Sequence, residues 1–324
     1  MEALLDLFGS PLVLSADPPW ENPDLFAEQV VAGLATGGIY ALVALAIVLI
    51  YRSTDVLNFA QGEMAMVSTF IAYSIAGPTL FDRMPIWLVL VLGVALAAVL
   101  GGAIERIVVR PVENAPLLSI VVVTVGLFIL LNSVATWIWA RDPLPKSFPS
   151  IFSTFDSVDL GIARVSQHHV SLLVIGMGMM VLLFLLFNYT KLGLGMRATA
   201  QNKLASQLMG INVGRMLTLG WALSGAVGGL AGMLIAPITL LHPAFMLGVL
   251  LFAFSAAVLG GLNSPPGAIV GGFIIGVTEN LLGTYTPEQV FGPEMKLPLM
   301  LLLLVIVLVV KPTGLFGRPQ TRRV

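Results

Sequence analysis

Residues 30–50 of the chain form the continuous apolar stretch VVAGLATGGIYALVALAIVLI, which contains no charged side chain. An α-helix rises about 1.5 Å per residue, so about 20 apolar residues cross the roughly 30 Å hydrocarbon core of a bilayer. This stretch is long enough to do so. It therefore predicts a first transmembrane helix from Val30 to Ile50.

Eight more apolar stretches follow, and the whole chain shares their character. Of its 324 residues, 57% are hydrophobic and 10% are charged, which is more apolar than soluble domains are. We therefore predict an all-α, polytopic integral membrane bundle of about eight or nine transmembrane helices. The other predicted spans are Leu57–Gly77, Ile86–Ile104, Leu117–Ala140, His169–Tyr189, Met216–Leu241, Phe245–Leu262, Pro266–Thr284 and Leu297–Val310.

Lysine and arginine are divided unequally between the two sides of this bundle. Short basic loops stay on the cytoplasmic side of a membrane. With the amino terminus outside and nine spans, eleven of the sixteen basic residues lie inside and five lie outside. We therefore expect a cytoplasmic carboxyl terminus. The inner residues are Arg52, Arg106, Arg110, Lys191, Arg197, Lys203, Arg215, Lys311, Arg318, Arg322 and Arg323, and the outer ones are Arg83, Arg141, Lys146, Arg164 and Lys296.

The segments outside the spans suggest a simple division of the chain. Residues 1–29 carry six acidic side chains and no lysine or arginine, so they lack the positive start of a cleaved signal peptide. We expect a retained, non-cytoplasmic acidic tail, a single transmembrane domain over residues 30–311, and a basic cytoplasmic tail over 312–324. The long outer loop 141–167 is either a structured cap or a plain connector.

The long inner connection, residues 190–215, has a different composition. Helix-forming residues run from Arg197 to Met209, and Gly210 follows them. Glycine commonly ends a helix. The pattern therefore predicts one short helix at the inner surface of the membrane, over residues 197–209.

Several polar side chains fall inside the predicted spans, where they are costly unless they face a cavity or a partner. Asn58, Gln61 and Glu63 lie near the inner end of the second span, and Glu279 and Asn280 lie deep in the eighth. These five residues are candidates for the lining or the gate of a substrate pathway. A purely structural role is an equally good interpretation of Glu63.

Glycines also recur at helix-packing spacing, in the pairs Gly33/Gly37, Gly225/Gly229 and Gly272/Gly276. Small residues four apart allow two helix backbones to approach closely. These pairs therefore predict tight helix crossings, with hinges as the alternative.

Other function classes lack their signatures in this sequence. There is no cysteine and there are three histidines, and a net charge of -1 offers no basic surface for nucleic acid. No glycine-rich loop ends in Gly-Lys-Ser or Gly-Lys-Thr, and no hydrolase motif is present. We expect no metal site, no cofactor, no nucleic-acid partner and no enzymatic activity in this chain, so any energy source is external.

Three stretches together resemble one known family. The first runs from Gly33 to Leu45 and leads into Asn-Phe-Ala-Gln-Gly-Glu at residues 58–63. The second is residues 195–212 of the inner connection, and the third runs from Gly260 through Pro266 to Glu279. In order and spacing they resemble the permease subunits of branched-chain amino acid ABC importers, in particular the shorter permease of high-affinity leucine/isoleucine/valine systems.

This resemblance implies a function and a set of partners. A permease of this kind moves branched-chain or other hydrophobic amino acids across a bacterial inner membrane by alternating access, within membrane lipid. It pairs with a second permease or a copy of itself, with two cytoplasmic subunits that bind and hydrolyse ATP, and with a periplasmic or extracellular substrate-binding protein. The resemblance also implies that the inner connection contains the coupling helix that docks on the ATPases, with candidate residues Arg197, Ala198, Asn202, Ala205, Gly210 and Asn212.

Two other kinds of transport stay open. Related permeases carry urea, short amides or other small polar solutes, and their motifs resemble these. A more distant alternative is a secondary transporter that uses an ion gradient through Glu63 and Glu279.

Overall fold

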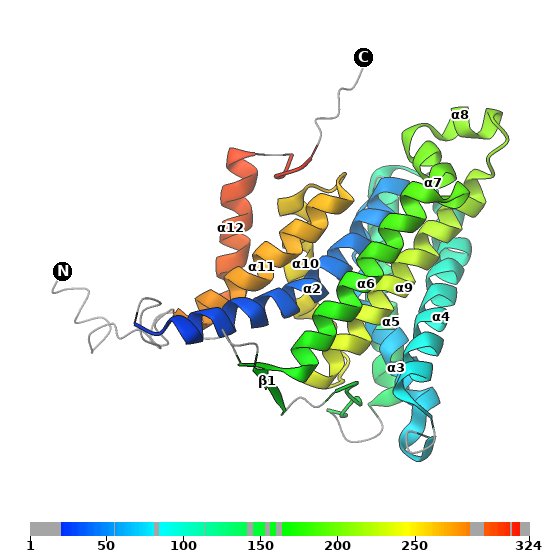
Figure 1. Ribbon diagram of the computed structural model, residues 1–324. Coiled ribbons are helices and arrows are strands. Elements are labelled where there is room, and N and C mark those ends of the chain that lie inside the picture. Colours follow the sequence, from blue (N-terminus) through cyan, green and yellow to red (C-terminus); the bar gives the residue numbers. More distant parts are fainter. Residues whose placement is uncertain are drawn as a thin grey trace, which may run out of the picture.

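The structure, a computed structural model, describes residues 21–54, 56–80, 84–113, 115–140, 145–152, 156–159, 164–285, 295–311 and 313–317 (Figure 1). Each of the nine predicted spans contains a helix, although the second begins at Gln61 and not at Leu57, because residues 57–60 form a turn. Six helices of the described residues are long and apolar enough to cross a membrane, while α3, α10 and α12 are shorter or less apolar. The nine helices are α2 (Pro23–Thr54), α3 (Gln61–Leu80), α4 (Ile86–Ile104), α5 (Leu117–Trp139), α6 (Gln167–Tyr189), α9 (Val213–Thr239), α10 (Phe245–Gly260), α11 (Pro265–Tyr285) and α12 (Lys296–Val310).

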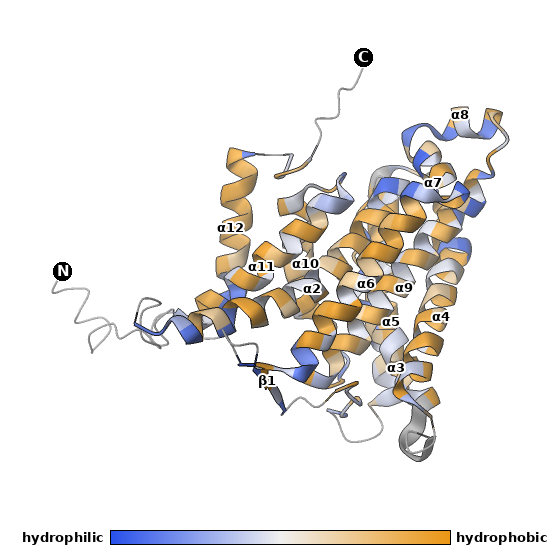
Figure 2. Cartoon of the chain, in the orientation of Figure 1, coloured by the Kyte–Doolittle hydropathy of each residue, from blue (hydrophilic) through white to orange (hydrophobic). Residues whose placement is uncertain are grey.

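Helices α2 and α9 form the centre of the bundle. In the most apolar 18 residues of α2, 89% of the residues are buried, and in those of α9, 83% are buried. The corresponding share is 28% in each of α4, α5 and α6. The outer helices nevertheless remain hydrophobic over most of their length (Figure 2). A helix that is apolar on its exposed face suits contact with lipid, because water would make that exposure unfavourable. The fold class is therefore the predicted polytopic membrane bundle.

The first helix begins earlier than predicted, which corrects the boundary of the acidic tail. Asn22 accepts a 3.2 Å hydrogen bond at Oδ1 from the backbone N–H of Leu25, and Asp24 lies in the first turn. Both features stabilise the amino end of a helix. Residues 23–29 are therefore helical, and residues 1–20 of the predicted tail lie outside the described residues.

The predicted glycine pairs of α2 and α11 pack against each other. A Cβ atom at Gly37 would lie 2.9 Å from the carbonyl oxygen of Gly272, and one at Gly276 would meet the backbone of Gly37. Only glycine allows so close an approach of two backbones. The crossing of α2 and α11 is thus a rigid contact between the beginning and the end of the bundle.

The glycines of α9 serve the same purpose against α4. A Cβ at Gly225 would collide with the carbonyl oxygen of Ala97, and one at Gly101 would collide with that of Trp221. Beyond Ile104, α4 continues as a π-helical turn, η1 (Glu105–Val109), and a short 3-10 turn, η2 (Arg110–Val112).

The outer connection contains ordered structure. Strands β1 (Ser157–Asp159) and β2 (Arg164–Ser166) form an antiparallel pair. Lys146 exchanges two backbone hydrogen bonds with Leu241, of 3.0 and 2.8 Å, which tie the connection to the turn between α9 and α10. The described part of this loop is therefore structured, and whether it caps a mouth of the bundle stays a prediction. Residues 141–144, 153–155 and 160–163 lie outside the described residues.

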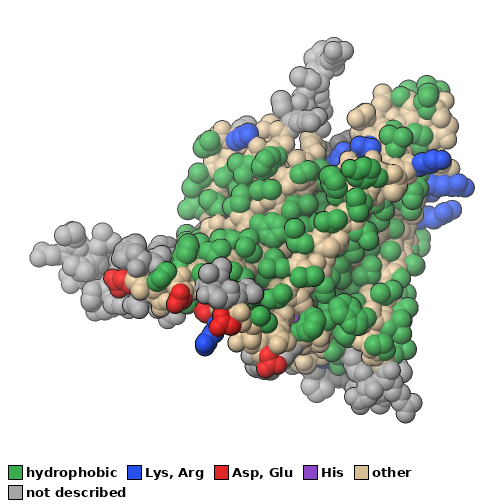
Figure 3. All heavy atoms as spheres, viewed as in Figure 1, with side chains coloured by type: hydrophobic (Ala, Val, Ile, Leu, Met, Phe, Trp, Pro, Cys, Tyr) green, Lys and Arg blue, Asp and Glu red, His purple; other side chains and the backbone are tan. Residues whose placement is uncertain are grey.

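Charged side chains separate between the two ends of the bundle (Figure 3). Lysine and arginine gather at the end that carries α7 (Lys191–Gln201) and α8 (Lys203–Leu208), whereas aspartate and glutamate gather near the β-strands and the start of α2. Arg83, Arg141, Arg318, Arg322 and Arg323 of the predicted charge distribution lie outside the described residues. Lys191, Arg197 and Lys203 thus share the end that the loop composition predicts to be cytoplasmic, and the side of the membrane that this end faces stays a prediction.

Candidate functional site

The first predicted polar group lies where α3 begins. Asn58 and Gln61 are fully buried. Asn58 accepts a 3.0 Å hydrogen bond from the Ala60 backbone at Oδ1 and donates to Gln61 Oε1 at 3.3 Å. Gln61 in turn donates to the Ser224 carbonyl at 3.3 Å, and Ser224 Oγ lies 3.0 Å from Gln61 Oε1. This polar cluster of Asn58, Gln61 and Ser224 connects the start of α3 to α9 in the interior.

The same polar cluster also contacts the central helix α2. Ser224 Oγ is 2.8 Å from the carbonyl oxygen of Ala46 in α2. Buried amides with all their partners present stabilise a unique arrangement of helices. Asn58 and Gln61 are therefore engaged with protein groups on both donor and acceptor sides.

Glu63 lies two residues after Gln61 in α3 and has a different environment. Its side chain is 2% exposed, and Oε2 accepts a 3.3 Å hydrogen bond from Asn132 Nδ2 of α5. The same amide donates at 2.9 Å to the carbonyl oxygen of Pro243, just before α10. The Asn132 amide therefore connects α3, α5 and the α9–α10 turn, and Glu63 is one of its two acceptors. Among the predicted residues, it is the buried carboxylate of the α3 cluster.

The second predicted group lies at the crossing of α2 and α11. Tyr40 donates a 2.6 Å hydrogen bond to Glu279 Oε2, and Asn280 donates to Thr36 Oγ1 at 2.9 Å. These contacts flank the glycine pairs described above. Lys296 of α12 also packs over Gly283, one turn beyond Glu279. Three helices thus meet around this carboxylate.

The inner element consists of two helices, so the single helix predicted over 197–209 is wrong. Asn202 separates α7 from α8 with an extended backbone (φ -157°, ψ 105°) and caps α8 by accepting a 2.9 Å hydrogen bond from the Ala205 N–H. A side chain that bonds the backbone ahead of it starts a new helix. The predicted glycine end is confirmed, because Gly210 follows α8 with φ +80°.

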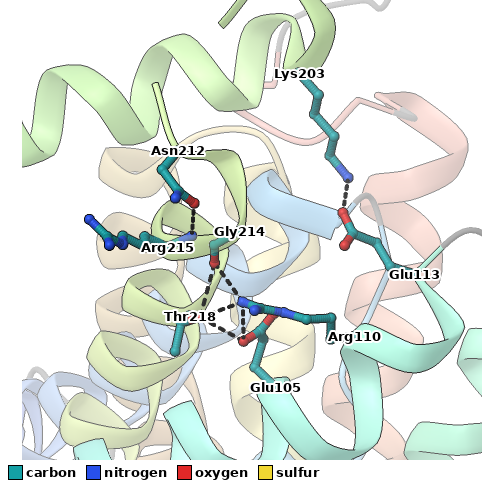
Figure 4. A network of polar contacts seen from close by, with 8 residues as sticks. All are labelled: Glu105, Arg110, Glu113, Lys203, Asn212, Gly214, Arg215 and Thr218. Carbon is teal, nitrogen blue, oxygen red and sulfur yellow. Dashed lines mark hydrogen bonds and ion pairs between the residues drawn. The ribbon is translucent and has the colours of Figure 1, made fainter. Parts of the chain in front are cut away.

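The element is tied to the ends of α4 and α9 by polar contacts (Figure 4). Asn212 caps α9, accepting a 3.0 Å hydrogen bond from the Arg215 N–H. Arg110 pairs with the buried Glu105 at 3.1 Å and donates to the Gly214 carbonyl at 2.8 Å. Lys203 Nζ lies 3.6 Å from Glu113 Oε1. Of these contacts, the Lys203–Glu113 pair joins the start of α8 to the end of α4, and the others fix the start of α9, which follows α8 in the chain.

The outward face of this element is apolar. Leu204, Leu208 and Met209 are 68%, 81% and 83% exposed, at the end of the bundle where lysine and arginine gather. Helix α8 projects beyond the transmembrane helices (Figure 1). Exposed apolar side chains on a rigid, basic element are typical of a protein-binding surface. Of the predicted coupling residues, Ala205 lies in α8, whereas Arg197 and Ala198 lie in the last turns of α7.

Four side-chain partners of the predicted residues are absent from the sequence-based prediction: Thr36, Tyr40, Asn132 and Ser224. Asn132 carries a detectable signal, since it is a lone amide in the middle of the apolar stretch 117–140. Ser224 and Tyr40 carry none, because serine and tyrosine are common in membrane helices. The described residues contain no cluster of histidine, aspartate or glutamate that could hold a metal ion.

Matches to known proteins cover most of the chain. Residues 29–308 match the family described as "Branched-chain amino acid transport system / permease component". The chain is 31% identical to the high-affinity branched-chain amino acid transport system permease protein LivH of Escherichia coli (strain K12), over 92% of this chain and 98% of that protein. It is 28% identical to the permease protein BraD of the corresponding Pseudomonas aeruginosa system, with the same coverage. The probable branched-chain amino acid transport permease protein LivH of Methanocaldococcus jannaschii is 31% identical, over 91% of this chain and 94% of that protein. No solved structure matches the chain.

Proposed function

We propose, from the premise that the chain belongs to the family of permease components of branched-chain amino acid transport systems, that it is the translocation subunit of an ATP-binding-cassette importer. Its cargo is a branched-chain or another hydrophobic amino acid. The chain itself carries no ATP-binding motif, so hydrolysis occurs on partner subunits.

The observation that carries this proposal is the α7–α8 element. An importer that uses external ATPases needs a rigid surface through which their closure moves the transmembrane helices. Helix α8 offers such a surface, because Leu204, Leu208 and Met209 are exposed, Lys203 pairs with Glu113 at the end of α4, and α9 begins directly after it at the Asn212 cap. We assign this face to the ATPases.

The remaining partners and the orientation follow from this assignment. The basic end with α7 and α8 faces the cytoplasm of a bacterial inner membrane, and the cap with β1 and β2 faces outward. A substrate-binding protein delivers cargo at the outer side. A second permease, or a copy of this chain, completes the translocation path.

For the substrate path we propose Glu63 and Glu279 as the groups that respond to the cargo. Each is a carboxylate inside the bundle with one described side-chain donor. Glu63 accepts a hydrogen bond from Asn132 of α5, and Glu279 accepts one from Tyr40 of α2. A carboxylate so placed can attract the ammonium group of an amino acid or hold a gate closed until the helices move. Asn58, Gln61 and Asn280 position the helices around them.

Uptake into proteoliposomes tests the proposal. The chain is reconstituted together with the ATPases encoded beside it. ATP is supplied on one side of the vesicle membrane and the binding protein on the other. Radiolabelled leucine and urea are compared. ATP-dependent accumulation of leucine supports the proposal. Accumulation of urea alone would move the cargo to small polar solutes, and uptake driven by an ion gradient without ATP would indicate a secondary transporter.

A further inference from the structure

A pocket lies at the basic end of the bundle, where α2, α6, α7 and α9 meet. Its polar lining comes from two helices, with Arg52 and Ser53 at the end of α2, and Arg197 and Thr199 on α7. The rest of the lining is apolar or alanine. The enclosed space is small and the pocket opens on one side, which suits one compact charged group.

Polar atoms in this pocket have no protein partner. Arg197 Nε and Thr199 Oγ1 are buried without a hydrogen bond, and Thr199 is 3% exposed. Among the ion pairs of the described residues, none includes Arg52 or Arg197. The positive charges of these two arginines also repel each other. Such an arrangement is unfavourable on its own and becomes favourable around an anion.

The pocket lies at the depth of lipid headgroups. The apolar stretch of α2 ends at Ile50, two residues before Arg52. Helix α6 ends at Tyr189, which is 78% exposed, and tyrosine is enriched at the membrane–water interface. Next to the pocket, α6 presents the exposed side chains of Phe184 and Leu185. An anion in the pocket therefore has an apolar helix surface beside it.

We infer that this pocket binds the phosphate group of an anionic phospholipid from the leaflet on the basic side. The two guanidinium groups bond the phosphate oxygens, the Thr199 hydroxyl donates a further hydrogen bond, and the acyl chains lie along α6. The bound headgroup joins α7 to α2, and so links the α7–α8 element to the central helix. This pocket is separate from the exposed face of α8, with Leu204, Leu208 and Met209, that is assigned to the ATPases.

Native mass spectrometry of the full-length, detergent-purified chain tests the inference. Retention of phosphatidylglycerol, phosphatidylcholine and inorganic phosphate is titrated on the wild type, on Arg52→Gln/Arg197→Gln and on Thr199→Val. Arg106→Gln/Arg215→Gln is the matched control, because both of its arginines are exposed at the same end outside the pocket. We expect the wild type and the control to prefer phosphatidylglycerol, and the double pocket variant to bind it roughly tenfold or more weakly.

Thr199→Val keeps the test decisive if the double variant fails to fold. It removes one unpaired hydroxyl with little change in shape, so it preserves the fold and weakens only headgroup binding. Equal retention of phosphatidylglycerol by wild type, double variant and Thr199→Val would overturn the inference. Equal binding of both lipids would do the same. Binding of inorganic phosphate without any preference for phosphatidylglycerol would assign the pocket to free phosphate instead.

Discussion

Tyr40 of α2 donates a 2.6 Å hydrogen bond to Glu279 of α11, across 239 residues of sequence. The bond lies beside the crossing at which Gly37 and Gly272 bring the two helices together. A close backbone crossing and a carboxylate contact therefore occur in one place. This combination makes the α2–α11 pair one body, which other helices can move against.

Removing the tyrosine hydroxyl tests this contact. Tyr40→Phe leaves Glu279 without its described donor, and we expect a loss of roughly 1–3 kcal/mol in the free energy of unfolding. Glu279→Gln alone should cost less, since an amide oxygen still accepts the bond. Unfolding in detergent of both single variants and the double variant gives the coupling energy, and additive effects would show that the two side chains do not interact.

The glycine crossing gives a second prediction. Gly276→Ala places a Cβ against the backbone of Gly37, whereas Gly178→Ala in α6 has nothing within 4 Å of the added atom. We expect the first change to destabilise the chain by about 1–3 kcal/mol and the second to be neutral. Thermal unfolding of the two variants in one detergent makes the comparison. Equal melting temperatures would show that α2 and α11 can move apart to accommodate the added Cβ atom without loss of stability.

The ion pair at the inner end of α4 gives a third. Arg110 neutralises Glu105, which is 2% exposed, so Arg110→Met leaves a buried carboxylate without its counter-charge, bonded by the Thr218 hydroxyl, and should cost roughly 3–5 kcal/mol. The matched change Lys203→Met breaks a more exposed pair, with side chains 42% and 28% exposed, and should cost about 0–1 kcal/mol. Denaturation curves distinguish the two. A larger loss from Lys203→Met would contradict the assigned burial.

The fourth prediction concerns Glu63. Asn132→Leu removes the one donor that bonds both Glu63 and the Pro243 carbonyl, so we expect a loss of roughly 1–3 kcal/mol in stability. Adding Glu63→Gln should restore part of this loss, because a neutral amide is less costly to bury than a carboxylate. Melting temperatures of the single and double variants measure the effect. A double variant less stable than Asn132→Leu would show that the carboxylate has another strong partner.

Much of the fold can be predicted from hydropathy. Each of the nine apolar stretches contains a helix, and α4 has the predicted ends, because the need to satisfy every backbone group in lipid leaves the helix as the one conformation for such a stretch. The glycine spacings also predict close crossings correctly. They do not say that Gly33 and Gly37 meet Gly272 and Gly276, since that choice depends on how the whole bundle packs.

The inner element is less predictable for a local reason. Residues 197–209 are nearly all helix formers, so composition favours one helix, yet Asn202 bonds the Ala205 backbone and starts a second. An asparagine inside a helix-forming run could have indicated this break. The polar cluster around Gln61 was predictable only in part, because its partner Ser224 lies 163 residues away and carries no signal of its own.

The most direct test of the central claim is whether α8 couples this chain to its ATPases. The chain is co-purified with the ATPases encoded beside it as wild type, as Leu204→Glu/Leu208→Glu, and as the control Phe316→Glu, which alters an exposed apolar side chain outside α8. Leucine-stimulated ATP hydrolysis is then measured with the binding protein present. We predict that the wild type and the control retain the ATPases and stimulated hydrolysis, and that the α8 variant loses both. An α8 variant that retains both, or a wild type that binds no ATPase, would contradict the account.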